Sequence, residues 1–161
     1  MKTMQHSEVT MRRDVPQSMR PHLAFAPDYV DVFTVPAARA QESSPEQWAR
    51  AAWEGADPRG RFLAWRVALQ LRMGSWSSPE FISGWTIADR GDDWIRIEAR
   101  SWCLTANCLF QVSAQAMSVA TMMRYDRAGA RYIWTPLSAI HRAAVPGMLR
   151  HAARLVERAR D

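Results

Sequence analysis

The sequence predicts an α+β protein in which an antiparallel sheet of about six strands wraps around one long C-terminal helix. Between residues 84 and 135, apolar and polar residues alternate in short runs separated by turn residues, which is typical of consecutive antiparallel strands. From Ile140 to the end, apolar residues recur at helical spacing. Two predicted helices lie ahead of this run and none lies between its strands. The 161 residues suit one domain.

The N-terminal part of the chain divides into a tail and a first strand. Residues 1–26 show no periodicity, so we expect a mobile tail ahead of a single domain at residues 27–161. Residues 29–35 alternate as a strand, with Tyr29, Asp31, Phe33 and Val35 on one face, and Pro36 ends it.

Two short helices are predicted after this strand. Ser44, Pro45 and Gln47 form a capping-box start, and the helix ends at Gly55. Asp57 and Pro58 repeat the start signal for a second helix, which Gly74 ends. The apolar face of this second helix consists of Phe62, Trp65, Leu69 and Met73.

The predicted strands of the second half cover residues 81–89, 93–102, 104–114, 117–125 and 131–135. In residues 104–114 and 117–125, apolar side chains occupy nearly every second position. We expect Pro146 either to kink the last helix or to mark its start.

The composition and the apolar pattern predict the compartment and the classes of partner. Lys2 is the only lysine among 21 basic residues, and the net charge is +5. Scattered arginines usually mark a solvated face, so we expect no nucleic-acid or membrane partner. The chain shows no signal-peptide core and no membrane-spanning run, which predicts a cytoplasmic protein. Cys103 and Cys108 are predicted to be buried thiols.

Three segments resemble a known superfamily over roughly residues 27–160. Pro27-Asp-Tyr-Val-Asp31, the helix with Trp48, and Arg131-Tyr-Ile-Trp134 followed by His141-Arg142 and Met148-Leu-Arg150 resemble the helix-grip fold of the START and birch-pollen-allergen (SRPBCC-like) superfamily, and within it a bacterial family with no established activity. The resemblance implies a pocket between sheet and helix. Related pockets carry lipids, hormones and polyketides, and some members are polyketide cyclases, including cofactor-free enzymes that catalyse cycloadditions in antibiotic biosynthesis.

In such a fold, one parity of each strand faces the helix and lines the pocket. The predicted lining is rich in methionine and aromatic residues, which suits a large unsaturated ligand. The candidate ligand-binding residues are Trp65, Leu69, Met73, Ile97, Cys108, Phe110, Met117, Val119, Met123, Trp134 and Met148.

Few polar residues are candidates for chemistry. Tyr125, Tyr132 and His141 are the candidate catalytic residues, the tyrosines as hydrogen-bond donors to a carbonyl and the histidine as a proton carrier. Asp28 and Asp31 are predicted to face apart and to make a poor acid–base pair. No nucleophile, nucleotide or metal motif occurs, and we expect neither a metal nor a cofactor.

The leading hypothesis is therefore a protein that binds an apolar polyketide-like molecule and promotes its cyclisation without a cofactor. Two alternatives stay open: a non-catalytic carrier of an apolar ligand, and an arginine-mediated binder of nucleic acid or a membrane surface. A homodimer is also open, because Trp94 and Trp102 fall on the polar face of their strand.

Overall fold

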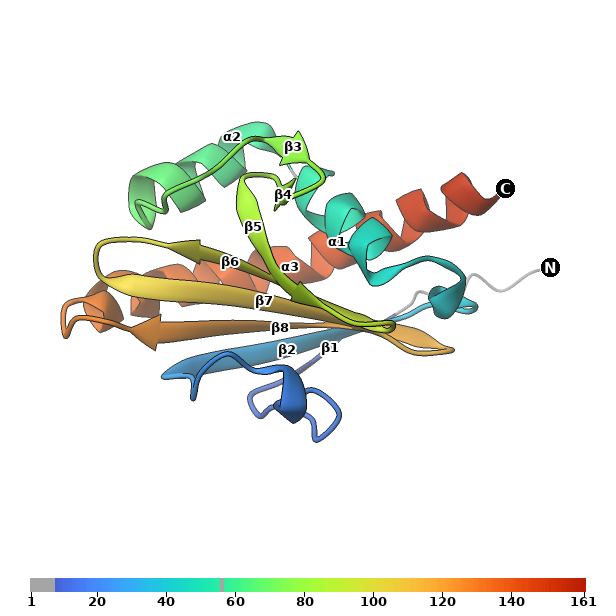
Figure 1. Cartoon of the computed structure of the whole chain (residues 1–161), viewed down its shortest axis with the longest axis horizontal. Coiled ribbons are helices and arrows are strands. Elements are labelled where there is room, and N and C mark those ends of the chain that lie inside the picture. The colour runs from blue at the N-terminus through green and yellow to red at the C-terminus, as the bar shows by residue number, and fades with distance from the viewer. Residues whose placement is uncertain (1–7, 56) are drawn as a thin grey trace.

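A computed structural model describes residues 8–55 and 57–161, and in it a curved antiparallel sheet packs against one long helix (Figure 1). Within these residues, eight strands follow the order β1-β2-β8-β7-β6-β5-β4-β3. The α+β class is confirmed, whereas the expected count of about six strands is wrong. The strands are β1 (Thr10–Arg12), β2 (Tyr29–Pro36), β3 (Ser77–Ser78), β4 (Phe81–Ile82), β5 (Trp85–Arg90), β6 (Trp94–Arg100), β7 (Leu104–Val112) and β8 (Ala116–Tyr125).

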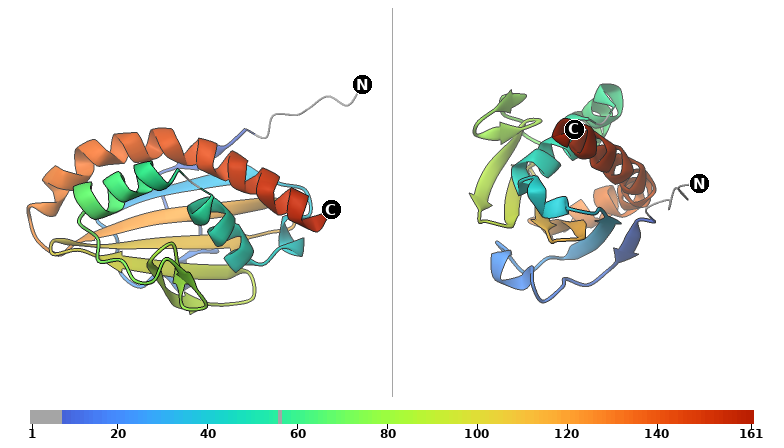
Figure 2. Two further views of the ribbon diagram at one scale, coloured as in Figure 1. Left: turned by 90° about the horizontal axis from the view of Figure 1, so that it is seen from above. Right: turned by 90° about the vertical axis from the view of Figure 1, so that its right-hand side faces the viewer.

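The helices lie mainly on the concave side of the sheet. Figure 2 shows α3 running diagonally along this side, with α1 and α2 next to it. The helical elements are the 3-10 turns η1 (Arg20–His22) and η2 (Ala40–Glu42), then α1 (Pro45–Glu54), α2 (Pro58–Arg61), the π-helix η3 (Phe62–Ala68) and α3 (Ala130–Arg160).

The last helix is longer than predicted, because residues 131–135 form its first turns instead of a strand. Tyr, Ile and Trp favour strands, and this preference misled the prediction. Tertiary packing decides otherwise: Trp134, Ser138, Val145 and Leu149 are buried at helical spacing. The helix continues through Pro146, which therefore does not mark its start.

The second predicted helix is shorter and differently wound. It begins at Pro58 as predicted, with the Asp57 carboxylate accepting from two backbone N–H groups. At Phe62 it changes to a π-helix that ends at Ala68, so it does not extend to Met73. Short π-helical segments are frequently found at functional sites.

Residues 8–26 pack against the sheet, although the sequence predicts a mobile tail; residues 1–7 lie outside the described part of the chain. β1 pairs with β2, and Met19 is fully buried on the convex face with Val32, Leu109 and Met122. The His22 ring stacks on Trp94 at 4.2 Å. These contacts put residues 15–25 on the face opposite α3.

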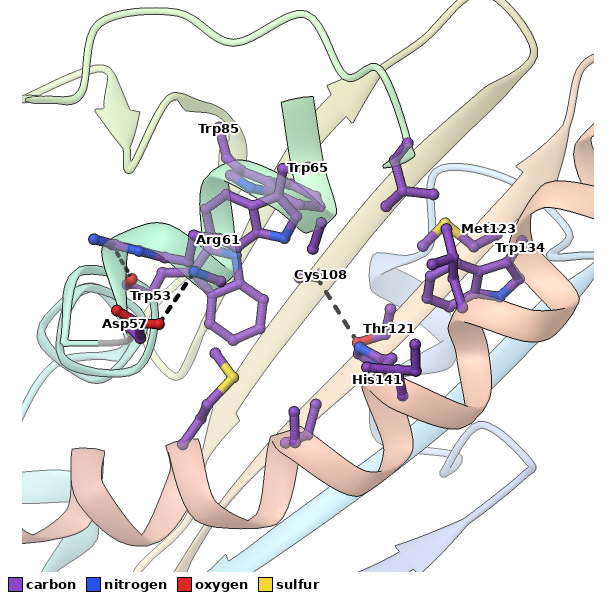
Figure 3. A pocket seen from close by; sticks show the side chains of 18 residues that line it. Trp53, Asp57, Arg61, Trp65, Trp85, Cys108, Thr121, Met123, Trp134 and His141 are labelled. Atoms are coloured by element: carbon purple, nitrogen blue, oxygen red, sulfur yellow. Dashed lines mark hydrogen bonds between the residues drawn. The ribbon is translucent and has the colours of Figure 1, made fainter. Parts of the chain in front are cut away.

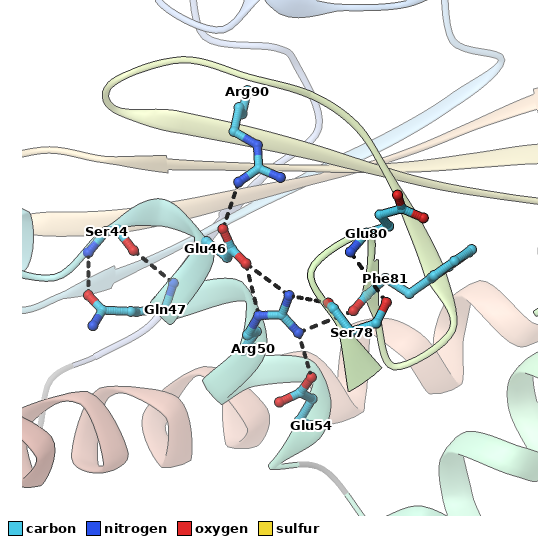
Figure 4. Close-up of polar contacts among 9 residues, drawn as sticks. All are labelled: Ser44, Glu46, Gln47, Arg50, Glu54, Ser78, Glu80, Phe81 and Arg90. Carbon is cyan, nitrogen blue, oxygen red and sulfur yellow. Dashed lines mark hydrogen bonds and ion pairs between the residues drawn. The ribbon is translucent and has the colours of Figure 1, made fainter. Parts of the chain in front are cut away.

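Arg50 links the first helix to the β3–β4 edge of the sheet. The predicted capping box is confirmed, with Ser44 and Gln47 bonded reciprocally. Arg50 forms ion pairs with Glu46 and Glu54 on α1. It also donates hydrogen bonds to the backbone carbonyls of Ser78 on β3 and Phe81 on β4 (Figure 4). This side chain therefore joins α1 to the edge of the sheet.

Replacing Arg50 should weaken the fold more than replacing a solvent-exposed neighbour. We expect Arg50→Gln to lower the free energy of unfolding by about 1–3 kcal/mol, because it removes charge-assisted bonds from a mostly covered site. Arg90→Gln loses one exposed ion pair to Glu46 and should cost under about 1 kcal/mol. Urea denaturation measures both, and equal losses would contradict this role for Arg50.

Candidate functional site

A polar row crosses the concave face of the sheet at its centre. The strand register pairs Asp31 on β2 with Thr121 on β8, Thr121 with Cys108 on β7, and Cys108 with Ile97 on β6. All four side chains point to the same face, because cross-strand partners share a side of the sheet. A carboxylate, a hydroxyl and a thiol thus lie in sequence on a surface that is otherwise apolar.

A pocket of about 320 Å³ lies between this row and α3 (Figure 3). Its volume is at the lower end of the range for small-molecule sites, about 300–1,000 Å³. Several exposed lining residues come from α2, η3 and the middle of α3, which places the mouth between these helices. The lining consists of Trp53, Asp57, Gly60, Arg61, Ala64, Trp65, Leu69, Trp85, Cys108, Thr121, Met123, Trp134, Leu137, Ile140, His141, Ala144, Val145 and Met148.

Side-chain size explains why the cavity forms here. The neighbouring inward row contains Phe33, Val119 and Phe110, and Trp53 of α1 packs edge-on against Phe110 at 5.2 Å. That contact fills the space between sheet and helix at one end. Over Cys108 and Thr121 the side chains are shorter and leave the space between the sheet and α3 unfilled.

Three tryptophans form one wall of the pocket. Trp53 stacks on Trp65 at 6.1 Å, and Trp85 meets Trp65 edge-on at 5.6 Å. They come from α1, η3 and β5, so the wall depends on three separate elements. Trp134 of α3 lies toward the other end of the pocket, beside Met123 in Figure 3. Such aromatic faces suit a flat or unsaturated ligand.

The polar part of the site is a hydrogen-bonded cluster around Asp31. Its carboxylate is fully buried and lies 3.0 Å from Nε2 of His141. The Tyr29 hydroxyl donates to the same carboxylate at 2.5 Å and accepts from Arg142 at 3.1 Å. Because a carboxylate only accepts, Nε2 of His141 carries the proton of this bond. Nδ1 is then the nitrogen that can take up or release a proton.

Burial and the neighbouring carboxylate shape the ionisation of this site. The pKa of Tyr29 is raised to about 12, mainly by burial and next by the hydrogen bond to Asp31. Burial is also the main reason that the pKa of the Cys108 thiol lies well above its ordinary value. Cys108 is therefore a neutral thiol at physiological pH and is unsuited to act as a nucleophile.

Six of the eleven predicted ligand-binding residues line the pocket: Trp65, Leu69, Cys108, Met123, Trp134 and Met148. The other five are not among the lining residues. Ile97, Phe110, Met117 and Val119 are fully buried in the core, and Met73 packs against it after the π-helix has ended. Alternation along a strand identifies which side chains face inward. Whether an inward side chain lines the pocket or packs in the core depends on the helices that cover it.

Of the three predicted catalytic residues, His141 lines the pocket, and the two tyrosines are not among its lining residues. Tyr132 is exposed because its position in α3 faces outward. Tyr125 ends β8, half-buried, where its backbone N–H donates to Asp28. The sequence did not predict Asp31 as the partner of His141. The available signal was a carboxylate on an apolar strand face.

A comparison of the chain with protein-family models, curated proteins and solved structures finds no match. Among the described residues, no three or more His, Cys, Asp or Glu side chains are grouped so that they could hold a metal ion. In the same part of the chain, no helix is both long and apolar enough to cross a membrane.

The buried Tyr29 side chain makes the free energy of unfolding depend on pH in the alkaline range. In the unfolded chain Tyr29 ionises near its ordinary pKa of 10, whereas in the folded chain its pKa is about 12. Its stabilising contribution is therefore fully present below pH 10 and is lost as the pH rises toward 12. The free energy of unfolding of the wild type should approach that of Tyr29→Phe over this range, as measured by urea denaturation. A difference that stays constant from pH 9 to pH 11.5 would contradict the geometry.

Proposed function

We propose that this protein binds an apolar, unsaturated molecule of the polyketide type and promotes its cyclisation without a cofactor. The observation that carries the proposal is an aromatic cavity whose wall includes His141, bonded to a buried carboxylate. An intramolecular cycloaddition converts two π bonds into two σ bonds and needs no leaving group and no oxidant. Holding the reacting ends together can supply about 7–11 kcal/mol of the barrier.

The cluster around Asp31 supports a role for His141 in such a reaction. Asp31 holds the ring by Nε2, and the ring also packs against Trp134 at 5.4 Å between centroids. Because Nε2 already donates to Asp31, Nδ1 of the fixed ring is free to accept a proton, and the protonated ring can then donate from Nδ1 to a ligand carbonyl as the bonds form. Asp31 itself is a positioning residue because it touches the histidine and is not a lining residue.

Binding in the pocket can be separated from binding elsewhere by two adjacent alanines of α3. Ala144 lines the pocket, and Ala143 is an exposed neighbour that is not a lining residue. We expect Ala144→Phe to weaken binding of a conjugated polyene at least about tenfold by filling the mouth, and Ala143→Phe to leave it unchanged. Quenching of tryptophan fluorescence reports the affinity, since four tryptophans line the cavity. Equal affinity in both variants would place the ligand elsewhere.

Catalysis is tested with linear polyenes that carry a tethered alkene and a conjugated carbonyl. The protein should cyclise at least one of them faster than buffer, and His141→Gln should lose about 100-fold in kcat while its affinity stays similar. Asp31→Asn should show the same loss with a changed pH profile, because it disturbs the orientation of the histidine. Chromatography of the products measures both. Tight binding without turnover by the wild type would contradict cyclase activity and favour a role as a non-catalytic carrier.

A further inference from the structure

Four N–H groups in the pocket wall are buried without a hydrogen-bond partner. Within residues 8–55 and 57–161, five buried side-chain nitrogen or oxygen atoms lack one. Four of the five belong to pocket-lining residues: Nε1 of Trp53, Trp85 and Trp134, and Nε of Arg61. Folded proteins pair nearly all such groups, so their concentration at one cavity requires a physical reason.

All four groups are donors, which defines the missing partner. An indole and a guanidinium can donate but cannot accept, so none of these residues satisfies another. Arg61 already uses Nη1 on the carbonyl of Trp53 and on the hydroxyl of Ser83. The partner of the remaining N–H groups must therefore bring acceptor atoms, and the rest of the lining is mainly hydrocarbon.

Local charge favours a neutral acceptor over a carboxylate. Burial is the main reason that the pKa of Arg61 is lowered, and the negative charges of Glu54 and Asp57 oppose that shift. The guanidinium also lies over the Trp76 ring at 4.2 Å. Because two carboxylates already balance its charge, this end of the pocket offers an anion little net attraction.

The donors occupy two ends of the cavity. Trp53, Trp85 and Arg61 gather at the end formed by α1, α2 and β5, whereas Trp134 of α3 lies toward the opposite end, with Cys108 between them in Figure 3. A hydrocarbon would leave both sets unpaired. A molecule with oxygen acceptors at both ends would meet both.

We propose that the ligand of this pocket is an uncharged molecule with carbonyl oxygens near both ends of an unsaturated apolar frame. This inference rests on the proposed function and narrows its substrate class. The four nitrogens are shielded from solvent in the structure. The proposal therefore requires that the side chains turn slightly toward the cavity when the acceptors bind. Donors directed at a conjugated carbonyl draw electrons from the π system, which assists a cyclisation.

The test uses two probes of nearly equal shape, fluorene and 9-fluorenone, in which a carbonyl group replaces the C9 methylene of fluorene. We expect fluorenone to bind about 2- to 12-fold more tightly, as one additional hydrogen bond implies. In ¹H–¹⁵N spectra, the indole N–H signal of at least one of Trp53, Trp85 and Trp134 should move downfield with fluorenone and not with fluorene. Equal affinities with no difference in the indole signals would overturn the inference.

Variants assign the signals and provide the control. Trp134→Phe and Trp85→Phe each keep an aromatic ring and remove one donor, so one of them should reduce the preference for fluorenone while leaving fluorene affinity similar. Trp102→Phe changes an exposed tryptophan that is not a lining residue and should leave the preference intact. Binding of neither probe to the wild type would contradict the proposed function and this inference together. Equal binding of both would overturn only the carbonyl preference.

Discussion

The carboxylate of Asp31 has no contact with solvent, and its need for partners governs how the helix sits on the sheet. A buried charge is tolerated only when it is paired and hydrogen-bonded. Tyr29 meets this need from the same strand, and His141 meets it from α3. Arg142 extends the cluster by donating to Tyr29 and Ser138. The polar cluster thus fixes the distance between α3 and the sheet at one end of the pocket.

The same constraint explains why the last helix begins at Ala130 and not near Ile140. Trp134, Ser138, His141 and Val145 fall on one face only if the whole segment is helical. A strand at residues 131–135 would separate Trp134 from this face. Local preference alone favours a strand for Tyr-Ile-Trp, so the sequence could not reveal a choice that depends on contacts with β2.

Much of the sheet was predictable because alternation is a local property. The inward face of β7 and the Tyr29-Asp31-Phe33-Val35 face of β2 were identified from single strands. The cavity was less predictable, since it depends on register between strands and on what the helices place above each row. Cys108 and Thr121 become neighbours only through the pairing of β7 with β8. Trp53 and Trp85 reach the same wall from elements far apart in the sequence.

The central claim is that the space between the sheet and α3 holds an apolar organic molecule. Native mass spectrometry of the protein purified from its own producing cells, followed by extraction with organic solvent, tests it most directly. We expect a bound mass that the solvent releases as an uncharged, unsaturated compound, and that is absent from the Ala144→Phe variant purified in the same way. A wild-type protein that carries nothing, and that shows no thermal shift with a panel of polyketides, would contradict the account.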